Sequence, residues 1–272
     1  MLKQSFTYLS WAHNQATDRY VRQAARDGYI ARSAYKLAQI DDKFKIFNKK
    51  QKSACIDLGA APGSWSQVIR QRCSDESVLF GVDRSPLSTS LVGYRFIQGD
   101  FTDPGVLKKL NEFLKAQNVA GNIDVIVSDM CPDRTGSGAD RFQLAELDMK
   151  VLMFAKRELK PGGHLVMKMI GGTSYYSEVL DSAKRNFGEV RISKPDASRE
   201  KSDETFLVGI SKLEKPREGI MISGLAPRRA TTTPGMMRDA YRKKQSTAAG
   251  RERFTNYDLD DWPGLTKFKM RK

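Results

Sequence analysis

The chain has few of the residues that build disulfide or metal frameworks. Among its 272 residues are three cysteines and two histidines. Cys55, Cys73 and Cys131 form no C-x-x-C pair, which argues against a disulfide framework and a zinc knuckle and favours a reducing compartment. With His13 and His164 as its two histidines, the chain lacks the ligands of a histidine metal site, and we expect no metal cofactor.

Long apolar runs are also missing. No stretch reaches the roughly 18–20 residues that cross a bilayer, and the longest apolar stretches, such as 123–130 and 164–170, have the length of strands. The N-terminus lacks the apolar core of a signal peptide. Its first 17 residues contain no acid, which weakly resembles an organellar presequence. We therefore expect no membrane partner.

Negative charge is scarce. The chain has 46 lysines and arginines against 32 aspartates and glutamates, which gives a formal net charge of +14. From Lys215 to the end, 14 residues are basic and 6 are acidic, with aromatic residues spaced among them. Such an excess favours a polyanionic partner, either nucleic acid or an anionic membrane surface. We expect residues 214–272 to form a basic, extended tail that lies along RNA or a protein surface; a merely solvated tail is the alternative.

The hydrophobic periodicity changes near residue 50. Residues 1–50 are basic and mostly helical in pattern, with one helix capped at Thr17 or Asp18 and ended by Gly28, and a second over 30–44. Residues 51–213 alternate between strand and helix patterns, which predicts a mostly parallel, doubly wound α/β sheet. Its last two strands lie too close in sequence for a crossover helix, so we expect an antiparallel hairpin at one edge. The expected strands cover 54–60, 78–85, 94–101, 123–130, 164–170, 189–195 and 204–210, and the expected helices cover 64–73, 103–117, 141–159 (ended by 160–163) and 174–187.

A glycine-rich turn follows the first expected strand. Glycines let a ligand approach the backbone, and the helix that begins at Ser64 would offer free N–H groups, as in nucleotide sites. The turn, residues 59–63, contains no lysine, which excludes a P-loop. Pro62 removes an N–H where a pyrophosphate would need one, which disfavours a dinucleotide and hence an NAD-linked dehydrogenase. S-adenosylmethionine, with an amino-acid end and an adenosine end, fits better.

Acidic residues at the ends of the next two strands support this ligand. We expect Asp83 to accept hydrogen bonds from both ribose hydroxyls and Asp100 to lie near the adenine amine. The alternative is that each is only a turn or cap residue.

Six segments occur in the order found in one known family and cover roughly residues 17–212. They are "DRYVRQAARDGYIARSAYKL", "DLGAAPGSWSQ", "GDFTD", "SDMCPDRTG", "PGGHLVMKM" and "KPDASREKSDETFLV". The chain thereby resembles the FtsJ/RrmJ type of ribosomal RNA 2′-O-ribose methyltransferase. The resemblance implies a Rossmann-like fold, S-adenosylmethionine as cofactor, and methylation of a uridine ribose in the A-loop of large-subunit rRNA. Other members act on tRNA or cap structures, so those substrates stay open.

The resemblance also implies site residues. The family's Lys-Asp-Lys-Glu tetrad matches Lys36, Asp129, Lys168 and Glu204. The cofactor contacts expected from the turn, the strand ends and this matching are Asp57, Gly59, Ala60, Pro62, Gly63, Ser64, Trp65, Asp83, Asp100, Phe101 and Asp129.

Lys168 stands inside an apolar strand pattern, where a charged lysine is costly unless it is paired or functional. A ribose hydroxyl is a poor nucleophile, so a base must take its proton as the methyl group moves. We expect Lys168 to be that base and Asp129 to orient it, while Lys36 and Glu204 position it and the ribose. Burial and a second ammonium lower a lysine's pKa and carboxylates raise it, so its protonation state stays open. The alternative is a lysine that extends from the strand end to solvent.

One departure from the family lies at Cys131-Pro132-Asp133, which replaces Ala-Pro-Asn and adds a negative charge near the RNA entry.

We expect a helical RNA-binding arm over 1–50, a methyltransferase domain over 51–213 and a tail over 214–272 that binds ribosomal or assembly proteins or RNA in a pre-ribosomal particle. A ribosome-assembly factor with secondary catalysis is the second reading. We expect a monomer in the mitochondrial matrix, with the bacterial cytoplasm as alternative. The expected contacts to RNA phosphates are Arg19, Arg22, Arg26 and Arg32.

Overall fold

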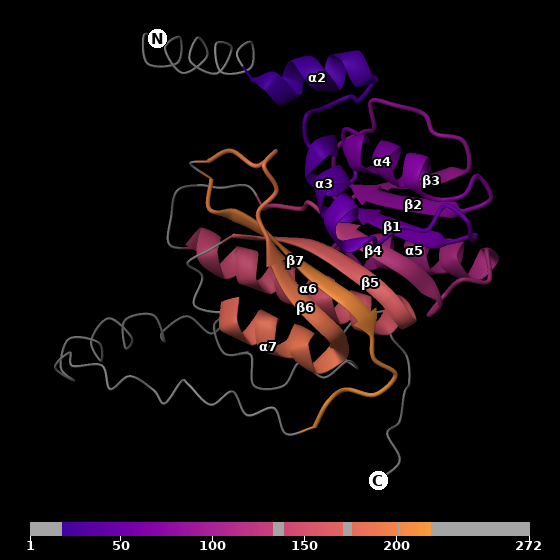
Figure 1. Ribbon diagram of the computed structural model, residues 1–272. Coiled ribbons are helices and arrows are strands. Elements are labelled where there is room, and N and C mark those ends of the chain that lie inside the picture. Colours follow the sequence, from indigo (N-terminus) through magenta and orange to yellow (C-terminus); the bar gives the residue numbers. More distant parts are fainter. Residues whose placement is uncertain (1–17, 133–138, 171–175, 201, 219–272) are drawn as a thin grey trace, which may run out of the picture. The chain divides into compact units, whose positions relative to one another are not determined.

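The computed structural model describes residues 18–132, 139–170, 176–200 and 202–218 (Figure 1). These residues belong to one compact unit that ends at Glu218. The predictions for the first 17 residues, for Asp133 and for most of the tail lie outside the described residues. In the described part of the chain, no helix is both long and apolar enough to cross a membrane.

The described strands form one mixed sheet in the order β3-β2-β1-β4-β5-β7-β6. Its first five strands run parallel, and β7 runs antiparallel to both of its neighbours. The predicted α/β fold, with a mostly parallel sheet and an antiparallel edge hairpin, is confirmed. The strands are β1 (Ala54–Leu58), β2 (Val78–Asp83), β3 (Tyr94–Gln98), β4 (Ile123–Ser128), β5 (Leu159–Ile170), β6 (Phe187–Ser193) and β7 (Glu204–Lys212).

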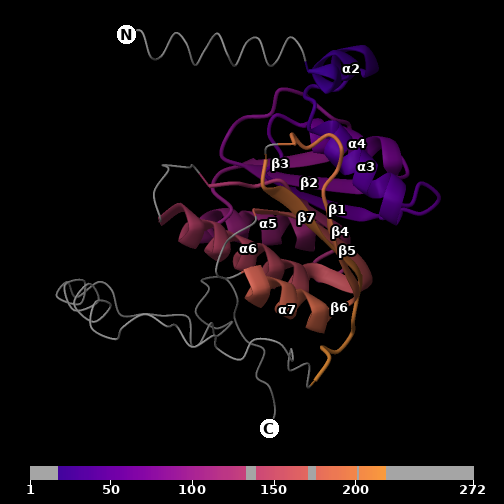
Figure 2. The same cartoon turned by 60° about the vertical axis from the view of Figure 1, so that its left-hand side comes forward.

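Helices cover both faces of the sheet. Figures 1 and 2 show α3 and α4 on one face and α5, α6 and α7 on the other. Two helix starts, those of α2 and α5, follow from local chemistry: Asp18 accepts a hydrogen bond from the backbone N–H of Tyr20, and Asp103 does the same for Gly105 next to Pro104. The helices are α2 (Arg19–Asp27), α3 (Ala34–Phe44), α4 (Ser64–Arg72), α5 (Pro104–Ala116), α6 (Ala139–Glu158) and α7 (Tyr176–Asn186).

The α3 helix is part of the core beneath the site. Ala34, Leu37 and Ile40 are buried on its inner face, as the helical period predicts, and pack in one cluster with α4 and with strand residues such as Val125 and Val166. This cluster therefore joins α3 to the sheet. The role of residues 1–50 as an RNA-binding arm stays a prediction.

One strand begins earlier than predicted. The sequence placed residues 160–163 at the end of a helix, but α6 ends at Glu158, and Leu159 already pairs with Ile123 of β4. A Cβ atom at Gly163 would lie 3.0 Å from the carbonyl oxygen of Asp124 and 3.1 Å from that of Ile123. Glycine is therefore needed here for the close approach of two backbones, not for a helix cap.

Candidate active site

The site lies where the parallel strands end. In an α/β sheet the carboxyl ends of these strands share one edge, where ligands bind. Asp83 ends β2 there and Asp129 follows β4, while Lys168 lies near the end of β5. Because β7 runs antiparallel, it begins at the same edge, and its first residue, Glu204, pairs with Ile170 of β5.

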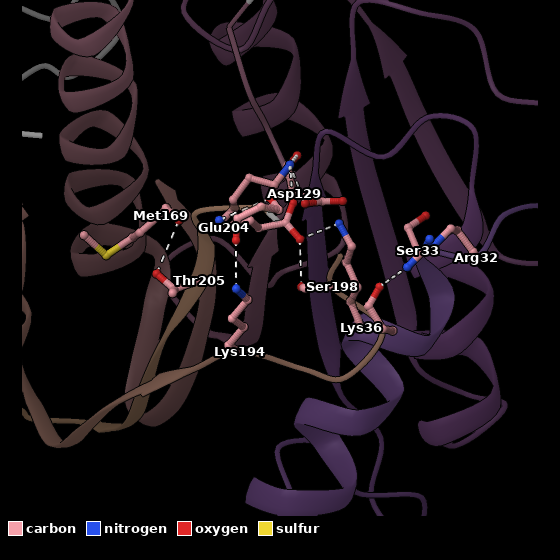
Figure 3. Close-up of polar contacts among 12 residues, drawn as sticks. Arg32, Ser33, Lys36, Asp129, Met169, Lys194, Ser198, Glu204 and Thr205 are labelled. Atoms are coloured by element: carbon pink, nitrogen blue, oxygen red, sulfur yellow. Dashed lines mark hydrogen bonds and ion pairs between the residues drawn. The ribbon is translucent and has the colours of Figure 1, made fainter. Parts of the chain in front are cut away.

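The four predicted tetrad residues meet at this edge. The ammonium nitrogen of Lys168 lies 2.6 Å from Asp129 Oδ1 and also donates to the Asp129 carbonyl oxygen at 2.9 Å. Lys36, which comes from α3, lies 2.7 Å from Glu204 Oε1. The other carboxylate oxygen of Glu204 lies 3.8 Å from Lys168 Nζ. Figure 3 shows Lys36 and Glu204 pointing toward one another beside Asp129.

Charge alternates through this cluster. Burial lowers the pKa of Lys168, but the carboxylates of Asp129 and Glu204 outweigh burial and raise that pKa above its ordinary value. Burial raises the pKa of Glu204, but Lys36 and Lys168 outweigh it and the pKa is lowered. In the protein alone, Lys168 is therefore an ammonium and Glu204 a carboxylate at neutral pH. Lys168 does not extend to solvent, since its side chain is 12% exposed.

A cavity of about 650 Å³ adjoins the tetrad at Asp129. Of the predicted cofactor contacts, Gly59, Asp83, Asp100, Phe101 and Asp129 line it. Three of these are carboxylates from three different strand ends, and Arg84 and Lys150 also line the cavity. Other lining residues were not predicted as cofactor contacts; they include Met130, Cys131 and Pro132 after β4 and Gln143, Glu146, Leu147 and Lys150 on α6.

Asp83 and Asp100 also shape the turns that carry them. Asp83 accepts hydrogen bonds from the backbone N–H groups of Ala61 at 3.0 Å and Ser85 at 2.7 Å. Asp100 Oδ1 accepts two hydrogen bonds from Thr102. Burial raises the pKa of Asp100, but the Thr102 hydrogen bonds together with the charges of Arg84 and Lys150 outweigh burial and lower the pKa, so the group is ionised at neutral pH. Asp83 and Asp100 therefore each stabilise a turn and also line the cavity.

The other predicted cofactor residues are not among those that line the cavity. Asp57 is fully buried and accepts a hydrogen bond from Ser66 Oγ at 2.6 Å. The indole N–H of Trp65 donates to the Ser33 carbonyl oxygen at 2.9 Å, and Ser64 Oγ lies 2.7 Å from Ser33 Oγ. These contacts fasten the glycine-rich turn to α3. Asp57, Ala60, Pro62, Gly63, Ser64 and Trp65 stay predictions as cofactor contacts, and so do the five residues that line the cavity.

The four predicted RNA-binding arginines differ in their surroundings. Arg19, Arg22 and Arg26 on α2 are exposed. Arg32 is partly buried: its guanidinium forms an ion pair with Asp18 and donates to the carbonyl oxygen of Ala197. The guanidinium of Arg32 therefore holds elements of this protein together, whereas Arg22 and Arg26 are exposed and Arg19 donates a hydrogen bond to the hydroxyl of its neighbour Tyr20 at 3.0 Å.

Comparisons with known proteins agree with this geometry. The family model described as FtsJ-like methyltransferase matches residues 29–212. "Ribosomal RNA large subunit methyltransferase E" of Ralstonia pickettii is 38% identical over 219 residues, which cover 77% of this chain and 97% of that protein. The protein of the same name from Paraburkholderia phymatum is 37% identical and covers 80% of this chain and 100% of its own length. A solved Plasmodium falciparum structure described as a ribosomal RNA methyltransferase has a TM-score of 0.57 and 27% identity, and covers 70% of this chain and 100% of that chain. This chain belongs to the FtsJ-like methyltransferase family.

Proposed function

We propose that this protein methylates a ribose 2′-oxygen of large-subunit ribosomal RNA, with S-adenosylmethionine as methyl donor. The observation that carries the proposal is the meeting of Lys36, Asp129, Lys168 and Glu204 beside an acid-lined cavity. The names of the bacterial relatives support ribosomal RNA as the substrate class. Within it, we propose a uridine of the A-loop in a pre-ribosomal particle as the target.

The donor set of the cavity fits this cofactor. S-adenosylmethionine supplies an electrophilic methyl group on a positively charged sulfur, and it carries an ammonium and a ribose diol. Carboxylates at Asp83, Asp100 and Asp129 suit those groups and would repel a pyrophosphate. Asp83 would accept hydrogen bonds from the ribose hydroxyls, Asp100 from the adenine amine. Asp129 would connect the cofactor cavity to the catalytic lysine, since its carboxylate contacts Lys168.

Lys168 would act as the general base. Its ammonium must first lose a proton, which becomes easier when a cationic ligand occupies the adjoining cavity, because like charges lower a lysine's pKa. The neutral amine, held by Asp129, then takes the proton of the 2′-hydroxyl. The ribose oxygen would then take the methyl group from S-adenosylmethionine in one in-line displacement, in which the methyl–sulfur bond breaks, S-adenosylhomocysteine leaves and no covalent enzyme intermediate forms. Lys36 and Glu204 would position the ribose, and no step in this sequence requires a metal.

Ribose-methylation mapping of RNA from cells that lack the protein tests the proposal. We expect one large-subunit uridine to lose its methyl group, and wild-type protein but not the Lys168→Ala variant to restore it. Normal methylation together with stalled large subunits would favour an assembly factor. Loss confined to tRNA or cap structures would exclude ribosomal RNA as the substrate.

We propose the bacterial cytoplasm as the site of action, because the curated relatives above come from bacteria. The expectation of a mitochondrial matrix protein depends on the N-terminus and the basic tail, which lie outside the described residues, and the relatives do not support it. A monomer and a tail that binds ribosomal or assembly proteins stay predictions.

A further inference from the structure

A short turn between β6 and β7 is docked onto α2 and α3. Ala197, in the turn Pro195–Ser198, is fully buried against Tyr20 and Tyr35. Its backbone N–H donates to Gln39 Oε1 at 3.0 Å, and its carbonyl oxygen accepts from Arg32. Both backbone polar groups of this one residue are therefore held by α3 or by the residues that lead into it.

The residues that hold the turn are themselves fixed. Gln39 Nε2 donates to the hydroxyl of Tyr20 at 3.0 Å, and Arg32 forms an ion pair with Asp18 at the start of α2. A partly buried amide with both ends engaged has little freedom to rotate, since each broken hydrogen bond would leave a polar group unpaired. The turn is thus anchored on two helices, and one of them carries Lys36.

The next residue of the turn contacts the tetrad. The backbone N–H of Ser198 donates to Pro195 at 2.8 Å, and its hydroxyl donates to Glu204 Oε1 at 2.9 Å. Lys36 contacts the same oxygen at 2.7 Å. Figure 3 shows Ser198 and Lys36 reaching this oxygen from two sides. The second oxygen, Oε2, stays 3.8 Å from Lys168, beyond hydrogen-bond distance.

We propose that the Pro195–Ser198 turn is a positioning element of the active site, in which Ser198 orients Glu204 so that Lys168 is hydrogen-bonded to Asp129 and not to Glu204. The inference rests on the proposed role of Lys168 as base. Without the Ser198 hydroxyl, Glu204 Oε1 loses a donor, and the partly buried carboxylate can rotate toward the Lys168 ammonium. A second close carboxylate stabilises the ammonium and makes Lys168 a weaker base at neutral pH.

Each element that packs against Glu204 and Lys168 contributes charged or titratable groups to their surroundings. They are Arg32 and Lys36 at α3, Asp129 and Cys131 after β4, Asp148 on α6 and, next to Arg32, Arg199 after the turn. Because the Ser198→Ala change alters none of these charges, a change in the pH dependence would report the orientation of Glu204.

The test compares purified full-length Ser198→Ala and wild-type protein in RNA methylation. We expect kcat at neutral pH to fall about tenfold, the size of one lost hydrogen bond to a charged group. We expect KM for RNA to stay the same and the rising limb of the pH–rate profile to move up by about one pH unit. Ser198→Thr keeps the hydroxyl and should restore both. Gln39→Leu, which releases Ala197, should move the profile in the same direction as Ser198→Ala.

Ser202→Ala is the matched control, because this serine lies in the same loop but its hydroxyl accepts a hydrogen bond from the backbone N–H of Glu204, at 3.3 Å, instead of donating to the carboxylate; its profile should match the wild type. A rate loss equal at every pH, or a shift that Ser198→Thr does not reverse, would overturn the positioning role. The pKa of the Lys168 ammonium, followed by NMR in wild type and Ser198→Ala, separates this inference from the proposed function. A higher pKa in the variant supports the positioning role even if RNA methylation is absent, and an unchanged pKa contradicts it.

Discussion

At the scale of single residues, the site depends on which protonation state each buried group adopts. The sequence predicts a lysine–carboxylate cluster but cannot predict the balance between burial and pairing, because that balance depends on distances of 2.6 Å and 3.8 Å between residues far apart in the chain. In the structure, Asp129 and Glu204 raise the pKa of Lys168, so this lysine is charged in the protein without ligands. The proposed base must therefore lose a proton before each methyl transfer.

The first prediction separates a base from a positive charge at position 168. Lys168→Arg keeps a cation that can pair with Asp129, but a guanidinium does not deprotonate in the accessible pH range. We expect single-turnover RNA methylation to fall by about 10²–10⁴-fold, with S-adenosylmethionine affinity by calorimetry close to that of wild type. The wild-type rate should rise with pH, since the raised pKa of Lys168 keeps the base form scarce at neutral pH. A Lys168→Arg protein with near-normal activity would exclude the base role.

A second prediction concerns the buried Asp57. Burial raises its pKa to about 7, with Ser66 as its hydrogen-bond donor. The folded state therefore holds a proton that the unfolded chain releases near pH 4, and stability falls by about 1.4 kcal/mol per pH unit between these values. Asp57→Asn removes this dependence. Between pH 5 and pH 8, we expect the free energy of unfolding of the wild type to fall by about 2–3 kcal/mol more than that of the variant. Urea denaturation at both pH values measures this difference.

A gap between variant and wild type that does not change with pH would contradict this reading of Asp57. The same protein also tests Asp57 as a cofactor contact, because a direct contact would lower S-adenosylmethionine affinity. Asp148 provides a comparison: burial raises its pKa to about 7 as well, so Asp148→Asn should show the same direction of change.

At the scale of helices and strands, the sequence predicts the features that depend on residues close together in the chain. Helix caps at Asp18 and Asp103 follow from residues within two positions. The early start of β5 could not be predicted, because it arises from the approach of Gly163 to the backbone of β4. Ser198 and Gln39 were missed for the same reason, since the hydrogen bond from Ala197 to Gln39 joins residues 158 positions apart. The turn after β1 was located correctly, but its sequence does not show which side α3 covers.

A third prediction tests how β2 and β3 support that turn. Gly81 of β2 makes room for Tyr94 of β3: a Cβ atom there would lie 1.7 Å from the Tyr94 hydroxyl. That hydroxyl accepts a hydrogen bond from Ser66 at 2.9 Å, and Ser66 also contacts Asp57 below the turn. Gly81→Ala must displace the ring, so we expect a loss of about 1–3 kcal/mol in stability by denaturation and weaker S-adenosylmethionine binding.

Gly188→Ala on β6 is the matched control. Its nearest neighbours would lie 3.4–3.5 Å from the new Cβ, an ordinary contact distance, and its position is away from the turn. We expect its stability to stay within about 0.5 kcal/mol of wild type. Equal losses in the two variants would mean that the Tyr94 packing does not support the turn.

At the scale of the whole molecule, the positive charge has two uses. The formal net charge of +14 favours RNA, but individual arginines do not contribute alike. Arg22 and Arg26 are exposed on α2, whereas Arg32 is committed to Asp18 and Ala197. The composition therefore predicts a nucleic-acid partner, and the burial of each arginine determines whether its side chain can contact that partner.

The last prediction compares Arg26→Gln with Arg32→Gln in salt-dependent RNA binding. Each phosphate contact adds about 0.7–0.9 to the slope of log K against log salt concentration, because it releases a counterion. Arg26→Gln should lower that slope by about this amount and leave the melting temperature unchanged. Arg32→Gln should leave the slope close to wild type but lower the melting temperature and kcat, because it frees the turn that carries Ser198. If Arg32→Gln instead changed the slope alone, Arg32 would be a phosphate contact, and the docking of the turn would not depend on it.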